Sequence, residues 1–385
     1  MPLDHARPDG EQITIFAREV ADPDGRDKPF LVYLQGGPGY EAPRPTDPGG
    51  PPWLERALKD YRVLMLDQRG TGRSTPVFGA RPAEYLMHFR ADSIVRDAEC
   101  LRRALGVERW SLLGQSFGGL CAVSYLSLAP EALREVLITG GLPPLGNRID
   151  DVYRATYRRV LERNRRYYER YPGDRERVLE LHRRLAAEDV RLPGGDRLTG
   201  RRLRQLGNSL GMSDGAEQLH YMLELPPDSP GFLHDVDAAL DFPRNPIYAV
   251  LHEACWADGG RTRWAADRLL PAELEAPEFF TGEHVYQWMF EEYGALAPLR
   301  DAAERLAEHE WPRLYDPERL RANEVPVAAI VYADDMYVPR ELSEETAAAI
   351  RGARCWLTNE YEHNGLRVDG ERILGRLIDM ARGRA

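Results

Sequence analysis

The run Gly114-Gln115-Ser116-Phe117-Gly118-Gly119 has the residue types of a serine nucleophile site. It matches the pattern Gly-x-Ser-x-Gly, in which the serine stands on a tight turn between a strand and a helix. The run follows an apolar segment at 110–113 and precedes another at 120–129, so both flanking elements are present. A helix that starts just past the serine directs its free N–H groups toward charge that develops on a substrate. We therefore predict that Ser116 is the nucleophile of an acyl-transfer reaction.

A serine nucleophile needs a base and an acid that orients this base. On a strand–turn–helix site the acid and then the histidine follow the serine along the chain, each after a later strand. Of nine histidines, His363 alone follows a late apolar strand, at 354–358, and precedes the last helical segment, so it is the predicted base. Asp334 and Asp335 follow the apolar run 325–332, and periodicity leaves both open as the acid.

The loop Gly36-Gly37-Pro38-Gly39 follows the first recognisable strand, at 30–34. Without a Cβ, its backbone N–H groups can approach a substrate oxygen closely. An oxyanion hole on such a site combines a donor of this kind with the amide that follows the nucleophile. We assign the hole to the amides of Gly37 and Phe117, and the alternative is a plain tight turn.

Strands and helices alternate along the parts of the chain that carry these residues. The predicted strands occupy 30–34, 61–67, 110–113, 136–139, 325–332 and 354–358. The predicted helices occupy 92–105, 120–129 and 370–380. Such alternation predicts an α/β fold with a mostly parallel sheet and helices on both faces.

The strand pattern is interrupted between the fourth and fifth predicted strands. Helical periodicity replaces it at 153–171, 175–187 and 238–256. We predict a core built from residues 1–146 and 311–385, and a helical cap built from residues 147–310. Because parallel sheets bind ligands at the carboxyl ends of their strands, the cap should lie over that edge.

The composition argues against several other classes of protein. A net charge of −11 argues against a nucleic-acid-binding protein, whose surface would carry a basic face. No apolar run approaches the roughly 20 residues that span a bilayer, and the start of the chain has no basic region followed by an apolar stretch. We therefore expect a cytoplasmic protein without a membrane partner. The four cysteines are far apart and show no metal-ligand spacing.

The basic residues are almost all arginines and form local clusters, for example at 158–159 and 163–166. Only Lys28 and Lys59 are lysines. We expect the clusters to be solvated faces of cap helices. Nothing in the sequence determines the oligomeric state.

Three motifs occur in order, at 34–39 (Leu-Gln-Gly-Gly-Pro-Gly), 67–74 (Asp-Gln-Arg-Gly-Thr-Gly-Arg-Ser) and 114–119. Together they resemble the proline iminopeptidases, also called prolyl aminopeptidases, of the α/β-hydrolase superfamily. The resemblance covers about residues 30–142 and 325–366 and weakens in the cap. It departs at Gln35, where the family has histidine, but this change removes no backbone donor.

The resemblance also implies which aspartate is the acid. The family's acid lies in a Gly-Arg-x-Asp-Met pattern followed by proline, which is similar to 332–336 and Pro339, although the glycine and the arginine are absent here. This similarity implies that Asp335 is the acid, with Asp334 as the alternative. The family's histidine loop is similar to 362–364.

In this family, acidic residues of the cap bind the free ammonium group of the substrate. Glu253 and Glu283 are the candidates here, because their separation in the sequence resembles that of the family's two cap glutamates. The nearby aromatic residues would wall a slot for the pyrrolidine ring or form the cap's own core. They are Tyr248, Trp256, Phe280, Tyr286 and Trp288.

The resulting hypothesis is a serine peptidase that releases N-terminal proline from peptides through a prolyl-ester intermediate, without a metal or an organic cofactor. Other small N-terminal residues are further candidate substrates. One alternative is an esterase, amide hydrolase or acyltransferase of the same fold that acts on a small molecule. A remoter alternative is a protein of this fold that only binds a ligand, which the ordered nucleophile, acid and base disfavour.

Overall fold

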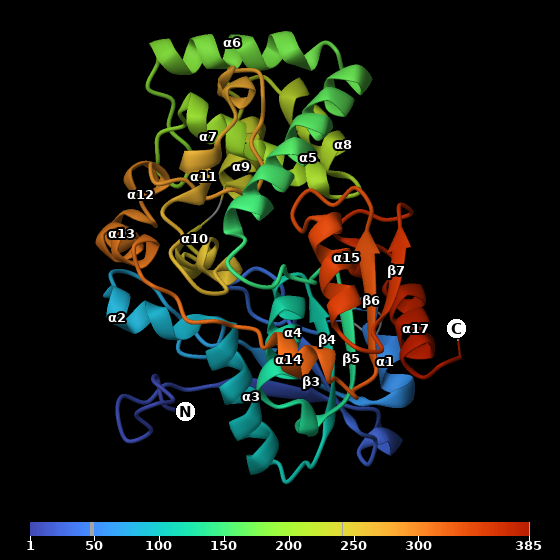
Figure 1. The fold of residues 1–385 in the computed structure, drawn as a ribbon. Helices are drawn as coiled ribbons and strands as arrows, with labels where there is room; N and C mark the ends of the chain where they lie inside the picture. The colour runs from blue at the N-terminus through green and yellow to red at the C-terminus, as the bar shows by residue number, and fades with distance from the viewer. Residues whose placement is uncertain (47–49, 241, 385) are drawn as a thin grey trace.

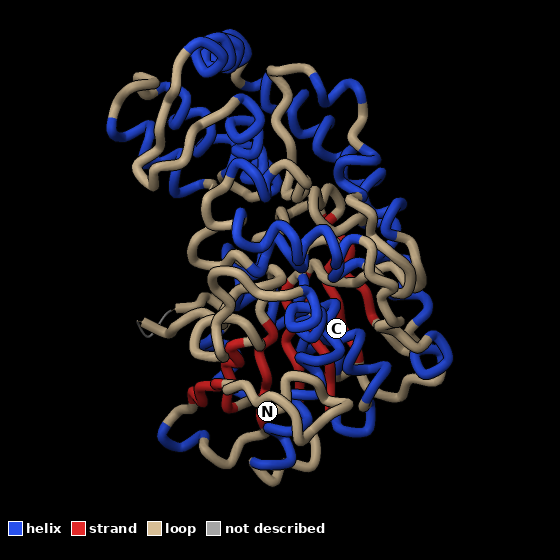
Figure 2. The backbone as a smooth tube through the Cα atoms, turned by 90° about the vertical axis from the view of Figure 1, so that its left-hand side faces the viewer, coloured by secondary structure: helices blue, strands red, loops and turns tan. Residues whose placement is uncertain are grey.

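Within residues 1–46, 50–240 and 242–384, which the computed structural model describes, the central element is a seven-stranded sheet (Figure 1, Figure 2). Its strand order is β1-β3-β2-β4-β5-β6-β7, and β1 alone in this described sheet runs antiparallel to its neighbour. The strands are β1 (Phe16–Val20), β2 (Phe30–Leu34), β3 (Arg62–Asp67), β4 (Trp110–Gln115), β5 (Leu133–Thr139), β6 (Val327–Tyr332) and β7 (Arg354–Thr358). The predicted α/β fold is confirmed.

Both faces of the sheet are covered by helices, which explains why its central strands are almost wholly apolar. Side chains alternate across a strand. In β2, Val32 and Leu34 join one apolar cluster, whereas Leu31 and Tyr33 join the other. The first cluster includes α3 (Ala91–Ala104) and α4 (Phe117–Leu128), and the second includes α1 (Leu54–Asp60) and α17 (Gly370–Ala381).

The chain between β5 and β6 forms a layer of helices at one end of the sheet, toward which the arrowheads of β6 and β7 point (Figure 1). Its α-helices are α5 (Ile149–Arg170), α6 (Asp174–Ala187), α7 (Gly200–Arg204), α8 (Gly215–Glu224), α9 (Pro230–Ala239), α10 (Ile247–Leu251), α11 (Ala265–Leu269), α12 (Met289–Glu292) and α13 (Arg300–Ala307). The chain then returns to the core through α14 (Pro317–Arg321), and α15 (Arg340–Ala349) follows β6. The cap limits at 147 and 310 stay a prediction. Among the described helices, the combination of length and apolar character needed to cross a bilayer does not occur.

A buried carboxylate joins the two connections between the cap and the core. Asp258 is 1% exposed. It accepts N–H groups from Gly146, where the chain enters the cap, at 2.5 Å, and from Leu314 and Tyr315, where it leaves, at 2.6 and 3.2 Å. The cap is therefore held to the core at its base.

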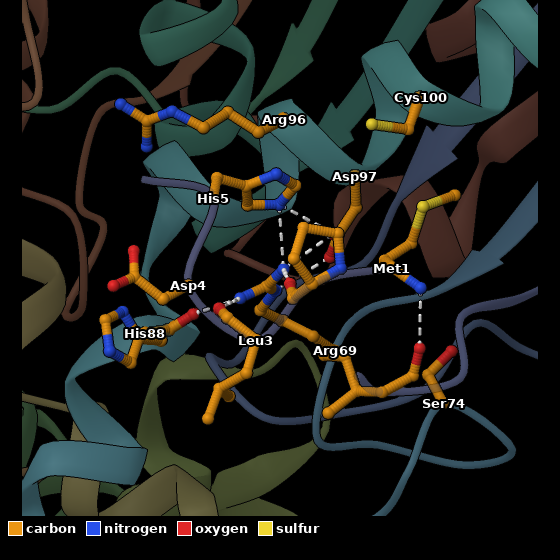
Figure 3. A network of polar contacts seen from close by, with 12 residues as sticks. Met1, Leu3, Asp4, His5, Arg69, Ser74, His88, Arg96, Asp97 and Cys100 are labelled. Carbon is orange, nitrogen blue, oxygen red and sulfur yellow. Dashed lines mark hydrogen bonds and ion pairs between the residues drawn. The ribbon is translucent and has the colours of Figure 1, made fainter. Parts of the chain in front are cut away.

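Arg69, the first arginine of the 67–74 motif, has a structural role in the core (Figure 3). Arg69 is 2% exposed and donates to both carboxylate oxygens of Asp97, at 2.7 and 2.6 Å. It also donates to the carbonyl oxygens of Leu3 and His88 and contacts Nε2 of His5. These bonds satisfy the buried guanidinium and hold the N-terminal segment against α3.

Two predictions of secondary structure were incomplete or wrong. No strand was predicted at β1, a polar edge strand whose apolar periodicity is weak. The helix predicted at 238–256 is divided: α9 ends at Ala239 and α10 begins at Ile247. Pro243 and Pro246 lie in the interruption, where they remove backbone donors. Residue 241 of this predicted helix lies outside the described residues.

Candidate active site

Ser116 stands on a sharp turn between β4 and α4. Its φ of 53° and ψ of −121° are unusual for a residue with a side chain. The neighbouring glycines are required because a Cβ at Gly118 would lie 1.9 Å from the Leu34 carbonyl oxygen, and one at Gly114 would lie 2.4 Å from the Gly118 oxygen. The turn thus presents the Ser116 hydroxyl at the end of the sheet that faces the cap.

Three side chains from three different loops form a continuous hydrogen-bonded chain. Nε2 of His363 lies 2.9 Å from Oγ of Ser116, and Nδ1 of His363 lies 2.7 Å from Oδ2 of Asp335. Asp335 follows β6 and His363 follows β7, so parallel strands bring them to the same edge as Ser116. This geometry suits a base that receives the serine proton while the carboxylate orients the imidazole.

The structure distinguishes the two candidate aspartates. Asp335 is 2% exposed, and its Oδ1 accepts N–H groups from Tyr337 and Val338 at 2.8 and 3.1 Å. Asp334 instead accepts a hydrogen bond from Arg166 at 2.9 Å, which lowers the pKa of its partly exposed carboxyl group. Asp335 is therefore the one of the two that contacts the imidazole.

The environment of His363 favours a charged imidazole. Burial lowers its pKa, because desolvation disfavours the charged form. The charge of Asp335 and its hydrogen bond act in the opposite direction, and the charge of Glu283 adds to them. The net effect is a pKa above the ordinary value, although Arg367 opposes it.

The two segments that carry the predicted oxyanion donors lie next to Ser116. A Cβ at Gly36 would lie 3.1 Å from the Cβ of Ser116, so the glycine loop passes directly beside the serine. Gly37 has a φ of 131° and lines the adjacent cavity. Phe117 is the first residue of α4, so its N–H has no carbonyl partner one turn earlier in the helix. The assignment of both amides to an oxyanion hole stays a prediction.

A cavity of about 320 Å³ opens at Ser116 and His363, between the core and the cap. The core also contributes Gln35, Gly37, Gln115, Tyr337 and Arg367 to its wall. The cap contributes Gln205, Asn208, Met212, Phe242, Tyr248, Glu283, Met289 and Tyr293, among others. The wall is therefore mostly uncharged and includes a carboxylate from the cap.

Glu283 provides this carboxylate. Its Oε1 lies 3.5 Å from Nε2 of His252, and its Oε2 lies 3.5 Å from the hydroxyl of Tyr248. The charge of Glu283 also contributes to the raised pKa of His363, so the Glu283 carboxylate interacts electrostatically with the imidazole of His363. A carboxylate in such a cavity is suited to bind a cation.

Glu253 lies elsewhere, in the interior of the cap. It is 7% exposed, and its Oε1 accepts the N–H of Ala266, at the start of α11, at 2.9 Å. This helix start needs an acceptor because Arg263 and Trp264 have left-handed backbones and provide no side-chain cap. Burial raises the pKa of Glu253, against the opposing effect of these backbone hydrogen bonds. Glu283 lines the cavity at Ser116 and Glu253 does not, and the amine-binding role of both glutamates stays a prediction.

Comparison with known proteins agrees with this geometry. Residues 29–234 match the family model for the alpha/beta hydrolase fold. The proline iminopeptidase of Aeromonas sobria is 49% identical over an alignment of 408 positions, which covers 99% of this chain and 95% of that protein. The chain belongs to the proline iminopeptidase family. The resemblance of the three motifs is thereby confirmed.

Other proline iminopeptidases differ in how much of the chain they match. The proline iminopeptidase aneH of Aspergillus aculeatus is 34% identical and covers 100% of this chain, with 92% of its own length. The probable proline iminopeptidase of Streptomyces coelicolor is 35% identical over only 140 residues, which are 36% of this chain and 40% of that protein. Similarity along the whole chain, cap included, is therefore a property of some members of the proline iminopeptidase family and not of all.

The structure distinguishes the two roles that were open for the aromatic residues near the cap glutamates, a cavity wall or the cap's own core. Of the five aromatic residues near the cap glutamates, Tyr248 lines the cavity, whereas Trp256, Phe280 and Tyr286 are buried in the apolar core that includes the cap. Trp288 packs against the same core. Four further aromatic residues line the cavity and were not predicted: Tyr40, Phe242, Tyr293 and Tyr337. Of these, only Tyr337 had a usable signal, because it follows Asp335 by two residues.

Proposed function

We propose that this protein is an aminopeptidase that releases N-terminal proline from peptides by acyl transfer through Ser116. One observation carries the proposal: the Ser116–His363–Asp335 chain opens into the same cavity as the Glu283 carboxylate. Full-length similarity to two proteins named proline iminopeptidase supports the choice of substrate.

In the first step, Ser116 Oγ attacks the carbonyl carbon of the N-terminal proline while Nε2 of His363 takes the hydroxyl proton. Asp335 orients the imidazole and stabilises its charge. The amides of Gly37 and Phe117 donate to the oxyanion. His363 then returns the proton to the departing peptide nitrogen, the C–N bond breaks, and a prolyl ester remains on Ser116.

In the second step, water attacks this ester. His363 accepts a proton from the water and passes it to Ser116 Oγ as the ester bond breaks. Proline leaves and the serine hydroxyl is restored. Every proton in this cycle is held by Ser116, His363, water or substrate, so the residues of the cavity suffice for the hydrolysis.

Glu283 supplies the preference for a free N-terminus. The proline nitrogen is a secondary ammonium group when it is unacylated, and a carboxylate on a mostly uncharged wall favours this cation. An acylated nitrogen has no charge to bind. The proposed partners are therefore peptides with a free N-terminal proline, and a cytoplasmic location stays a prediction.

The test compares hydrolysis of proline β-naphthylamide with that of its N-acetylated form and of the alanine analogue, with Ser116→Ala as the control. We expect cleavage of the free-amine proline compound and its loss in Ser116→Ala. Cleavage of simple esters without amide turnover would favour the small-molecule esterase instead. Amide turnover that survives in Ser116→Ala would refute the proposed nucleophile.

A further inference from the structure

Three arginines of the cap helix α5 contact the loops that carry the acid and the base. Arg159, Arg163 and Arg166 recur at intervals of four and three residues, so they lie on one face of α5. We call these three residues the arginine row. Figure 1 shows α5 beside the loops that follow β6 and β7. We expected the arginine clusters to be solvated, and the Arg166 side chain, 54% exposed, agrees with that expectation, whereas the Arg159 and Arg163 side chains are only 20% and 12% exposed.

The arginine row holds the loop of the catalytic acid. Arg163 donates to the backbone carbonyl of Asp334 at 2.8 Å, and Arg166 donates to the Asp334 carboxylate at 2.9 Å. Arg159 donates to the carbonyl of Ala333 at 3.4 Å. The residue that precedes Asp335 is thus held both by its backbone and by its side chain.

Arg163 of the arginine row also holds the loop of the base. Arg163 donates to both carboxylate oxygens of Glu362, which precedes His363, and the Nη1 bond measures 2.8 Å. Two other cap residues, Gly211 and Ser213, also contact this loop. Gly211 accepts the His363 backbone N–H at 3.4 Å, and the Ser213 hydroxyl donates to the Asn364 side chain at 2.8 Å. Three consecutive residues centred on the base are therefore held by the cap.

We infer that Arg163 is a positioning residue of the catalytic triad, because its single guanidinium joins the residue before the acid to the residue before the base. The inference rests on the proposed function for the roles of Ser116, His363 and Asp335. It makes the cap helix α5 a part of the catalytic framework, in addition to the substrate-binding role of the cap.

The chemistry of arginine suits this role. Its planar guanidinium binds a carboxylate through two parallel bonds and keeps further N–H groups for a carbonyl. The Arg163 side chain is only 12% exposed, so water competes weakly for these bonds. Acid and base must keep their geometry within a fraction of an ångström, and a displacement of about 1 Å can cost about a hundredfold in rate.

The decisive experiment uses Arg163→Met and Glu362→Ala, each with a matched control. Arg165→Met removes a neighbouring arginine of α5 whose partner is the exposed Glu273 of the cap. Glu360→Ala removes a glutamate of the same loop as Glu362, but its partner is the exposed Arg372. All variants are compared by thermal unfolding before their kinetics are measured.

We expect kcat for the prolyl substrate to fall at least about tenfold in Arg163→Met and in Glu362→Ala, with KM within about twofold of the wild-type value. The double variant should lose little more than the worse single variant, because Arg163→Met already removes the contact that Glu362→Ala breaks. The two controls should stay within about twofold of wild type. The inference is overturned if the Arg163 and Glu362 variants match their controls, or if KM carries the loss. If Arg163→Met does not fold, Glu362→Ala decides by the same criteria.

The labelling rate of Ser116 by a fluorophosphonate provides a readout that does not depend on peptide specificity. We expect it to fall at least about tenfold in both test variants and not in the controls. Wild-type protein that is labelled but does not cleave the prolyl substrate would overturn the proposed function and leave this inference testable. Equal labelling of wild type and both test variants would overturn the inference alone.

Discussion

Nε2 of His252 lies 3.5 Å from Oε1 of Glu283, in the wall of the catalytic cavity. His252 is 3% exposed, and its Nδ1 lies 3.3 Å from the hydroxyl of Tyr153. Burial raises the pKa of Tyr153 well above its usual value, so the phenol keeps its proton and can donate it to Nδ1. With Nδ1 as the acceptor, Nε2 can donate to Oε1 of Glu283, and this contact orients the carboxylate in the cavity wall.

The first prediction concerns Glu283. Glu283→Gln removes the charge that attracts the substrate ammonium, and a charge-assisted hydrogen bond contributes about 1.5–3 kcal/mol. We expect kcat/KM for proline β-naphthylamide to fall roughly 10- to 100-fold. Steady-state kinetics on the free-amine substrate measures this loss.

Glu253→Gln is the matched control for this charge. Its side chain caps α11 inside the cap, so we expect kcat/KM to stay within about threefold of the wild-type value, as for a change away from the substrate. A larger loss in Glu253→Gln than in Glu283→Gln would reverse our assignment of the amine site.

The second prediction separates the adjacent aspartates. Asp335→Asn leaves the imidazole without the carboxylate that orients it, and we expect kcat to fall by about three to four orders of magnitude. Asp334→Asn weakens only the partly exposed ion pairs with Arg166 and Arg159, so we expect a loss of about threefold or less. Similar losses in the two variants, measured under saturating substrate, would contradict the triad geometry.

The third prediction concerns pH. His363 acts as a base only when it is neutral, and its pKa is raised above 6.5. Activity should therefore be lost, as pH falls, at a higher pH than an ordinary histidine would give. Because Asp335 provides the largest upward effect, the remaining activity of Asp335→Asn should have its acid limb at lower pH, and Glu283→Gln should shift it in the same direction. The profile of kcat/KM against pH, recorded for the wild type and both variants, gives the three acid limbs. An acid limb that moves to higher pH in either variant would be inconsistent with these charges.

The fourth prediction concerns the turn at Ser116. A Cβ at Gly118 would lie 1.9 Å from the Leu34 carbonyl oxygen, so Gly118→Ala should displace the turn from β2. We expect a loss of about 3 kcal/mol in the free energy of unfolding, together with nearly complete loss of activity. Urea denaturation provides the first quantity.

Gly173→Ala is the control for this substitution, because Gly173 has an ordinary φ of −68° and a Cβ there would meet nothing within 4 Å. Its free energy of unfolding should change by no more than about 0.5 kcal/mol. Comparable destabilisation at the two glycines would show that the close approach at Gly118 is unimportant.

Several features of this protein were determined by its sequence alone. The turn at Ser116 is one, because Gly-x-Ser-x-Gly between an apolar strand and a helix specifies local torsions and local clearances. The position of His363 is another, since the order of strands in a parallel sheet places late loops at the same edge. Both depend on neighbours in the chain or on the succession of elements.

Other features were decided only by the tertiary structure. Asp334 and Asp335 are adjacent and chemically identical, and only the packing of their loop directs one toward the imidazole and the other toward Arg166. Glu253 and Glu283 are both acidic residues of the cap, but one caps a helix and the other lines the cavity.

The arginine row shows the physical reason most clearly. Helical periodicity places Arg159, Arg163 and Arg166 on one face of α5, but it contains no information about what covers that face. Arg163 is separated from Asp334 by 171 positions and from Glu362 by 199. Contacts between residues so far apart in the sequence depend on how the cap packs on the core. Only the folded chain therefore reveals that part of the cap supports the catalytic loops.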